Sequence, residues 1–417
     1  MLKEEIYATI ESGDIEKALD LLNNYAKTSD HEQLFEAAEL YYELGHVEQA
    51  KHIINQLLEL YPDEGSLFIL AAEMMIDADE EDEAIEQLLE VREDDDSFLQ
   101  AQLLLADLYQ LQALDEVAEQ KLLAAAKKAP EEMIITYALG EFYLDQGSYN
   151  KAIPYLKRAL HADLGEVNVA LGLAEAYSAN GQFEDALHLY HQQEVTKMPP
   201  NTLFNFGFTA YQQGDYSVAI EQLEAVKALD ADFTSVYAPL ARAYEAENRL
   251  KESLEVVESG LRMDEFNDLL PLLAGKLLLK MSDPTGSEQY FRQAIALNPA
   301  NVEALQALAA LLRDQERAEE LDELISHAKE YGETDGLLTW YHAYAKAELE
   351  HYKEALILYQ EAYVFLHTDS DFLKEYSSFL LEEGQRDQAI RVLKEALIHD
   401  PAKQDIAELL DQLEANA

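Results

Sequence analysis

The sequence predicts an all-α solenoid of about twelve helical hairpins with a C-terminal capping helix. The first observation behind this prediction is a small residue that recurs about every 34 residues through almost the whole chain. The second is the apolar spacing of amphipathic helices on both sides of the repeat's central turn. Together they are typical of a structure in which each hairpin buries its apolar face against the next one.

The clearest copy of the repeat covers residues 133–166. Its first half has the apolar spacing of a helix with one buried face, and Gly147 then interrupts the pattern. A second amphipathic helix is expected over Tyr149–His161. Gly140 and Ala152 fall where the two helices would cross, and their small side chains would let the backbones approach to contact distance. The two helices are therefore predicted to form a tight hairpin.

Two sets of small residues test the period independently. The counterparts of Ala152 in the other second helices are Ala18, Ala50, Ala84, Ala118, Ala186, Ala219, Ser253, Ser287, Leu321, Ala355 and Ala389. Successive members lie 34 residues apart, except for one spacing of 32 and one of 33. The counterparts of Gly140 in the first helices are Ala38, Ala72, Ala106, Ala174, Gly207, Ala241, Gly275, Ala309, Ala343 and Ser377, all of them small. The agreement of the two sets makes chance a poor explanation of the period.

The repeats fall into three expected segments along the chain. We expect an N-terminal half of six repeats with an acidic groove over residues 1–200, a C-terminal half of repeats seven to twelve over 201–403, and a capping helix over 404–417. The register shortens by one residue near Pro200, which favours a joint between the halves there. Pro239 falls inside the expected first helix of the eighth repeat and should bend or interrupt it.

The repeat resembles that of the tetratricopeptide repeat (TPR) family. The matching residues in the clearest copy are Leu139, Gly140, Tyr143, Gly147, Tyr149, Ala152, Leu156 and Ala159, and other copies end in the matching prolines Pro62, Pro130, Pro299 and Pro401. The resemblance covers essentially the whole chain. In length, acidity and lack of appended domains the chain is also similar to the YpiA-like cytosolic TPR proteins of Bacillus-type bacteria. The resemblance implies a right-handed superhelical solenoid that serves as a protein-binding scaffold, with a concave surface formed mainly by the first helices.

Net charge and composition exclude several classes of function. The chain carries 30 basic and 83 acidic residues, a net charge of −53, so a nucleic-acid backbone would be repelled. The absence of cysteine excludes disulfides, thiolate catalysis and cysteine-ligated zinc. The N-terminus lacks the basic-then-apolar order of a signal peptide, and the longest apolar stretch, 269–279, is too short to span a bilayer. A cytoplasmic protein without membrane insertion is expected.

The candidate binding residues occupy the positions that would face the concave surface in the family. At the ninth position of repeats two to six stand the acids Glu39, Glu73, Asp107, Glu141 and Glu175, and further acids stand at the thirteenth position at Glu43, Asp77 and Asp145. We call these eight acids the acid ladder. Aromatic residues alternate with them at Phe35, Tyr42 and Tyr137. From the seventh repeat on the surface changes to Phe204, Phe208 and Tyr211, followed by the bases Arg242, Lys276 and Lys280.

Two interpretations of the acid ladder remain open at this point. In the first, it steers and orients a basic segment of a partner protein, while apolar residues between the acids supply most of the affinity. In the second, the acids are ordinary solvated side chains of an acidic protein, since one residue in five is acidic. Family members that clamp the C-terminal carboxylate of chaperones use Lys, Asn and Arg at concave positions. Phe35, Glu39 and Glu73 stand at the matching positions here, so that mode of binding is not expected.

No catalytic constellation is recognisable, and no cofactor or metal is expected. His188 and His191 lie three residues apart after Glu184 and Asp185, which is a weak zinc pattern compared with an ordinary helix surface. The preferred function is a non-catalytic scaffold or adaptor that holds a peptide or helical segment in its groove. The alternative is a ligand- or peptide-sensing regulatory subunit that changes superhelical pitch on binding, with Pro200 or Pro239 as hinges. Only the second would change its radius of gyration with its ligand.

Overall fold

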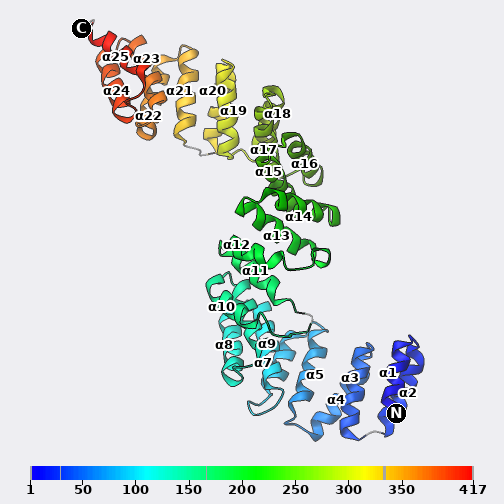
Figure 1. Ribbon diagram of the computed structural model, residues 1–417. Coiled ribbons are helices and arrows are strands. Elements are labelled where there is room, and N and C mark those ends of the chain that lie inside the picture. Colours follow the sequence, from blue (N-terminus) through cyan, green and yellow to red (C-terminus); the bar gives the residue numbers. More distant parts are fainter. Residues whose placement is uncertain (1, 29, 166, 332–334, 416–417) are drawn as a thin grey trace. The chain divides into compact units, whose positions relative to one another are not determined.

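The structure is a computed structural model that describes residues 2–28, 30–165, 167–331 and 335–415. Those residues form 25 α-helices and two short 3₁₀ turns, with no β-strand among them. The chain divides into two compact units, Met1–Glu194 and Val195–Ala417, here called the N-terminal and C-terminal units. Within each unit, antiparallel helix pairs follow one another in chain order (Figure 1). The predicted all-α repeat solenoid is confirmed.

The N-terminal unit contains six hairpins. Their helices are α1 (Leu2–Glu11), α2 (Ile15–Thr28), α3 (His31–Glu43), α4 (Val47–Leu60), α5 (Gly65–Ile76), α6 (Glu81–Leu89), α7 (Phe98–Leu111), α8 (Asp115–Lys128), α9 (Met133–Asp145), α10 (Tyr149–Ala159), α11 (Val169–Ala179) and α12 (Phe183–Tyr190). Each odd-numbered helix is the first of its hairpin and packs against the even-numbered helix that follows. The first helices form a row, because α3 also contacts α5, α5 contacts α7, and α9 contacts α11. A hydrogen bond between Gln110 and Asp145 joins α7 to α9.

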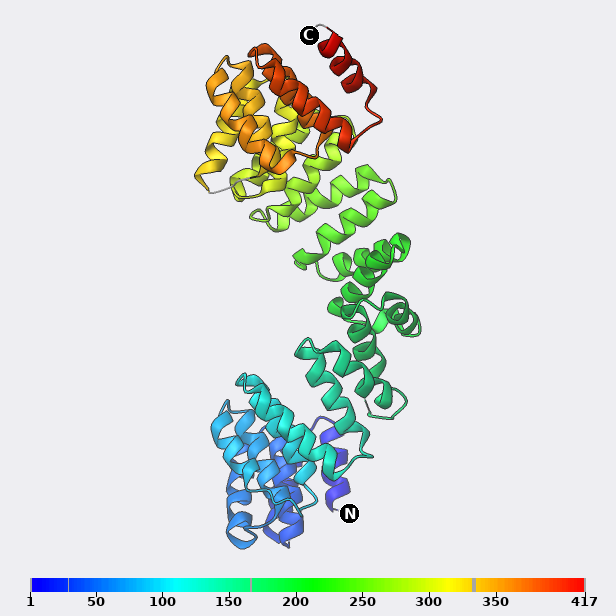
Figure 2. The same cartoon turned by 90° about the vertical axis from the view of Figure 1, so that its left-hand side faces the viewer.

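The C-terminal unit contains six further hairpins and a last helix. Its elements are η1 (Val195–Lys197), α13 (Pro200–Gln213), α14 (Tyr216–Leu229), η2 (Thr234–Val236), α15 (Tyr237–Ala246), α16 (Leu250–Met263), α17 (Leu269–Lys280), α18 (Pro284–Leu297), α19 (Val302–Asp314), α20 (Ala318–Glu330), α21 (Gly336–Glu348), α22 (Tyr352–Leu366), α23 (Ser370–Glu382), α24 (Arg386–His399) and α25 (Gln404–Ala415). The last helix packs on α24, and its residues Ile406 and Leu410 are buried. Figure 2 shows α25 in dark red after α24 at the C-terminal end of the unit. This helix covers apolar surface that the twelfth hairpin would otherwise expose.

The small residues at the helix crossings are required by the packing. A Cβ atom added to Gly140 would lie 2.6 Å from Leu156 Cδ2, and one added to Gly275 would lie 2.4 Å from Phe291 Cε1. Ala152, the other small residue predicted at this crossing, is fully buried. These distances are far below van der Waals contact, so the close helix crossings predicted from the sequence are confirmed.

Every hairpin turn contains one residue with a left-handed backbone. The twelve residues are Gly13, Gly45, Asp79, Ala113, Gly147, Gly181, Gly214, Asn248, Ser282, Glu316, Glu350 and Gly384. They follow the same spacing as the small residues, so the turn is a third marker of the repeat. Half of them are not glycine, although only glycine adopts this conformation without a steric penalty.

Pro239 shortens its helix instead of bending it. The structure begins α15 at Tyr237, after a 3₁₀ turn over Thr234–Val236, so Pro239 lies in the first turn of the helix. Amide groups in the first turn have no intrahelical acceptor, and the missing N–H of proline therefore loses no bond there. The expected interruption inside the helix was wrong because the helix starts later than the repeat pattern indicated.

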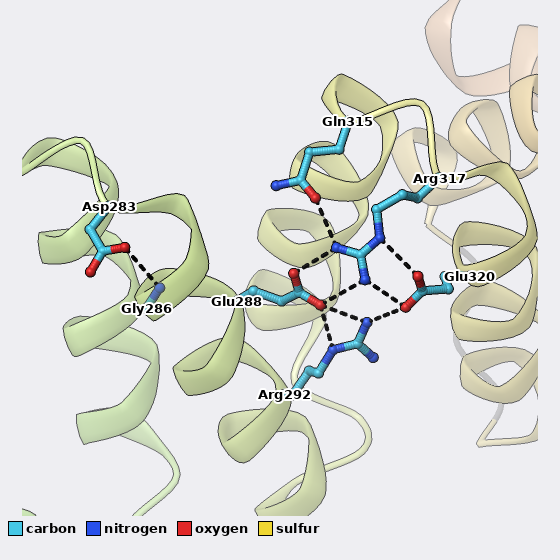
Figure 3. Close-up of polar contacts among 7 residues, drawn as sticks. All are labelled: Asp283, Gly286, Glu288, Arg292, Gln315, Arg317 and Glu320. Carbon is cyan, nitrogen blue, oxygen red and sulfur yellow. Dashed lines mark hydrogen bonds and ion pairs between the residues drawn. The ribbon is translucent and has the colours of Figure 1, made fainter.

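An ion cluster joins the second helices of the ninth and tenth repeats (Figure 3). The guanidinium of Arg317 donates to both carboxylate oxygens of Glu288, at 2.6 and 3.0 Å, and to both of Glu320, at 2.8 and 2.7 Å. Arg292 donates to the same two carboxylates. Hydrogen bonds from Arg317 lower the pKa of Glu288, so this carboxylate stays ionised. A network of bidentate pairs holds adjacent repeats more firmly than an isolated surface pair does.

Candidate functional site

The acid ladder lies on consecutive first helices of the N-terminal unit. Its members come from α3 (Glu39, Glu43), α5 (Glu73, Asp77), α7 (Asp107), α9 (Glu141, Asp145) and α11 (Glu175). Glu73 and Glu141 are half-buried, and the other six remain exposed. Because these helices form one row, the ladder extends along the unit.

Hydrogen bonds tie ladder residues to the neighbouring repeat. The hydroxyl of Tyr42 on α3 donates to Asp77 Oδ2 on α5 at 2.6 Å and lies 3.2 Å from the carbonyl oxygen of Glu73. Gln100 Nε2 on α7 donates to Glu73 Oε1 at 3.2 Å. Gln110 on α7 bonds in the same way with Asp145 on α9. These contacts between repeats hold the acids in fixed positions along the row.

Glu141 has the least satisfied carboxylate of the ladder. Its Oε1 atom is buried and has no hydrogen-bond partner among the described residues. A Cβ atom added to Gly172 on α11 would lie 2.5 Å from this oxygen, so the glycine leaves the space that the carboxylate fills. The hydroxyl of Tyr137 donates to the same carboxylate from one helical turn away. Glu141 is thus held against α11 with one oxygen lacking a donor.

Burial raises the pKa of four acids of the ladder above their ordinary values. For Glu141, burial is the main cause, and the charges of Asp145 and Glu175 add to it. Burial likewise raises the pKa of Glu73 and Asp145, although a hydrogen bond from a glutamine opposes the shift in each. For Asp107, burial by surrounding protein atoms is the only cause of the raised pKa, although part of the residue remains exposed to solvent. Ionisation of these four acids is therefore less favourable in the folded protein than in water.

A pocket of about 320 Å³ lies where Phe35 meets the next repeat. Its apolar lining is Phe35, Leu57 and Leu67, and its polar lining includes Glu32 and Glu64. The pocket combines an apolar floor with carboxylates at its edge, which suits an apolar side chain next to a basic one.

The three predicted aromatic residues of the seventh repeat lie together on α13 in the C-terminal unit. The rings of Phe204 and Phe208 stack at 5.9 Å, and those of Phe208 and Tyr211 lie 6.4 Å apart. Phe233 extends the group, with its ring 5.1 Å from that of Phe204. Phe208 is 38% exposed, a large fraction for a phenylalanine. We call Phe204, Phe208 and Tyr211 the aromatic row.

A partly buried polar cluster lies further along the C-terminal unit. Glu375 Oε1 accepts hydrogen bonds from Trp340 Nε1 at 2.7 Å and from the Tyr359 hydroxyl at 2.9 Å. Its other oxygen pairs with Arg313, whose guanidinium lies 4.7 Å from the centre of the Trp340 ring and 4.9 Å from that of Tyr344. The cluster connects four helices of three successive repeats, α19, α21, α22 and α23.

No group of three or more potential metal ligands is found in the part of the chain that the structure describes. His188, part of the weak zinc pattern, has its Nε2 atom 2.9 Å from Gln192 Nε2. Among the described helices, none is long and apolar enough to cross a membrane.

Sequence reasoning missed two glutamines and a glycine that contact the acid ladder. Gln100 and Gln110 stand at the second and twelfth positions of their repeat, which are concave positions, so the repeat register contained the signal for them. The role of Gly172 had no such signal. It depends on the direction in which the Glu141 side chain turns, and only the structure shows that direction.

Comparisons with known proteins agree with the repeat architecture. Family models of YpiA-like tetratricopeptide repeats match residues 110–164, and of YpiA-like C-terminal tetratricopeptide repeats residues 337–403. General tetratricopeptide repeat models match 143–193 and 272–320, and a model of the tetratricopeptide repeat protein 21 ARM repeat matches 31–118. The chain is 42% identical to the TPR repeat-containing protein YpiA of Bacillus subtilis (strain 168) over 415 residues, which is 99% of this chain and 98% of that protein.

Solved structures with detectable similarity include two helical-repeat proteins. The crystal structure of the APC/C hetero-tetramer Cut9-Hcn1 has a TM-score of 0.41 at 13% identity and covers 99% of this chain and 96% of its own. The crystal structure of YrrB, described as a TPR protein with an unusual peptide-binding site, has a TM-score of 0.40 at 16% identity and covers 45% of this chain and 96% of its own.

Proposed function

Because the chain belongs to the YpiA-like family of tetratricopeptide repeat proteins, we propose that it is a non-catalytic scaffold that binds partner proteins through the acid ladder. The partner segment is basic and carries apolar anchors. Its Lys or Arg side chains pair with the ladder, and an apolar side chain enters the pocket beside Phe35.

The single observation that carries this proposal is the buried, unpartnered Oε1 atom of Glu141. A buried carboxylate oxygen without a donor lowers stability, because burial removes water and no protein group replaces it. Burial also raises the pKa of Glu73 and Asp107, although no oxygen of these two carboxylates is both buried and unpartnered. A cationic side chain from a partner would supply a compensating charge beside Glu141, and a donor once the carboxylate turns away from Gly172.

The expected division of energy follows from the exposure of the groups. Six of the eight ladder acids are exposed, and an exposed ion pair contributes about 0–1 kcal/mol. Burial of a large apolar side chain contributes roughly 1.5–3 kcal/mol. Charge therefore sets the encounter rate and the orientation, whereas the apolar anchors supply most of the affinity.

The test is affinity capture from an extract of the organism that encodes the chain, at low and at physiological salt. The test variant carries Glu39→Gln, Glu73→Gln and Glu141→Gln, which remove three charges from the ladder with little change of volume. Retained proteins are identified by mass spectrometry, and a basic segment from each is synthesised and titrated against the full chain. Loss of these segments from the variant, and weaker binding at higher salt, are the expected results.

The matched control removes the same number of charges from second helices of the same unit, by Glu59→Gln, Glu86→Gln and Glu184→Gln. All three side chains are exposed. If both variants weaken binding equally, only the net charge of the protein matters and the ladder is not a site. Retention of the same basic segments by the ladder variant would also refute the proposal.

A further inference from the structure

The C-terminal unit contains a pocket of opposite character to the acid ladder. Its volume is about 450 Å³, and it is lined by side chains from α13, α15, α17 and α19, which are first helices of four successive repeats. The lining residues that matter here are Tyr211, Arg242, Leu269, Leu272, Lys276 and Lys280. We call this the basic pocket.

Three cations meet in the basic pocket of a chain that holds only 30 basic residues against 83 acidic ones. Lys280 pairs with Glu245 at 2.7 Å, and Lys276 pairs with Glu303. Arg242 is exposed and has no ion-pair or hydrogen-bond partner among the described residues. With three cations and two carboxylates in the lining, the pocket has a positive excess although the protein is strongly negative.

The change of sign occurs at one structural position. Arg242 and Lys276 stand at the ninth position of their repeats, the position that holds acids in repeats two to six. A surface that served only to keep an acidic protein soluble would have no reason to reverse charge at this position. The reversal therefore points to recognition of a group that the acid ladder would repel.

The apolar part of the lining sets the second requirement on a ligand. Leu272 is buried at the floor of the pocket, while Leu269 is 37% exposed. Tyr211 belongs both to the pocket and to the aromatic row, and its ring lies next to that of the exposed Phe208. A ligand that fits this lining has a large apolar side chain beside its negative charge.

We propose that the basic pocket binds an acidic peptide segment of a partner protein, with a carboxylate on Arg242 and an adjacent apolar side chain against Leu269 and Tyr211. The two lysines contribute by exchanging their internal partners for the ligand, since exposed ion pairs of this kind contribute only about 0–1 kcal/mol each. The site lies wholly within the C-terminal unit and is independent of the acid ladder.

The experiment selects ligands for the full chain from a random peptide library displayed on phage, without prior choice of sequence. The targets are the wild type, Arg242→Glu and the matched control Lys251→Glu, which makes the same charge change at an exposed side chain on α16 of the same hairpin. The wild type and the control are expected to enrich peptides in which Asp or Glu adjoins a large apolar residue. Arg242→Glu is expected to lose that class.

The best acidic peptide is then labelled with fluorescein, and its anisotropy is titrated with each protein. We expect Arg242→Glu to weaken binding about ten- to hundred-fold, because a charge-assisted hydrogen bond is lost and a repulsive charge is added. Lys251→Glu should change affinity less than about three-fold through long-range charge alone. Failure to enrich an acidic class, or equal weakening by both variants, would overturn the proposal. Basic peptides would be ligands of the acid ladder, so their enrichment does not count as binding to the basic pocket.

Discussion

Replacement of Glu375 by alanine should destabilise the C-terminal unit by about 2–4 kcal/mol. Glu375 is the acceptor for Trp340 Nε1 and for the Tyr359 hydroxyl, and Trp340 and Tyr359 are only 8% and 2% exposed. A buried donor left without an acceptor costs about 1–3 kcal/mol. The loss of the Arg313 pair adds less, because that guanidinium is partly exposed and keeps its contacts with aromatic rings.

The assay uses the only tryptophan in the chain as its reporter. Trp340 belongs to the affected cluster, so its fluorescence during urea unfolding follows this part of the structure even if the repeats do not all unfold together. At a slope of about 2 kcal/mol per molar urea, the expected loss lowers the midpoint by about 1–2 M. Glu375→Gln can keep the oxygen that accepts both hydrogen bonds, so it should lose less stability than Glu375→Ala.

The matched control is Glu382→Ala on the same helix, α23, where the side chain is exposed. It should shift the free energy of unfolding by less than about 0.5 kcal/mol. A Glu375→Ala variant that behaves like this control would refute the reasoning, since the two donors would then be satisfied without Glu375.

Three further perturbations test other parts of the structure. Glu141→Gln should raise the free energy of unfolding at pH 7 by about 0.5–1 kcal/mol, since a raised pKa means that ionisation of Glu141 destabilises the fold. The gain should shrink as pH falls towards 4, where the wild-type carboxylate becomes protonated. An equal difference in melting temperature between variant and wild type at both pH values would contradict this. Gly275→Ala should lower the free energy of unfolding by about 1–3 kcal/mol, because the new methyl group clashes with Phe291. Adding Phe291→Leu should recover much of this loss, as measured by thermal unfolding. Asp95→Ala should lower the free energy of unfolding in urea by about 1–2 kcal/mol, because the Asp95 carboxylate caps α5 by accepting from the amide of Gly65 at 2.9 Å and also accepts from the amide of Ser97. An unchanged free energy of unfolding would rule out the capping role.

The fold was predictable because its main determinants repeat along the sequence. Close helix crossings require small residues, and Gly140 and Ala152 with their counterparts mark each crossing. Polar contacts between repeats were less accessible. The pair between Arg313 and Glu375 joins residues 62 positions apart, and no period relates them. Sequence could place both on helices but could not bring their side chains together.

The candidate sites were predictable to a similar depth. The repeat register assigned the ladder acids and Arg242 to one face, and the structure places them on first helices, as the register required. The buried state of one Glu141 oxygen depends on local packing that composition does not encode. The basic pocket likewise needed the structure, because its lining comes from four helices that only the fold brings together. Binding at either surface stays a prediction.

The left-handed turn residues that are not glycine are positions at which the protein can be stabilised by substitution. Ala113, Ser282, Glu316 and Glu350 adopt positive φ without being glycine, at an expense of about 1 kcal/mol each. Each stands in a different hairpin, so replacements by glycine should add nearly independently. A chain with all four replacements would tolerate damage elsewhere. This stabilised variant could be used as the background for charge-reversal substitutions in either concave surface, because the protein would remain folded.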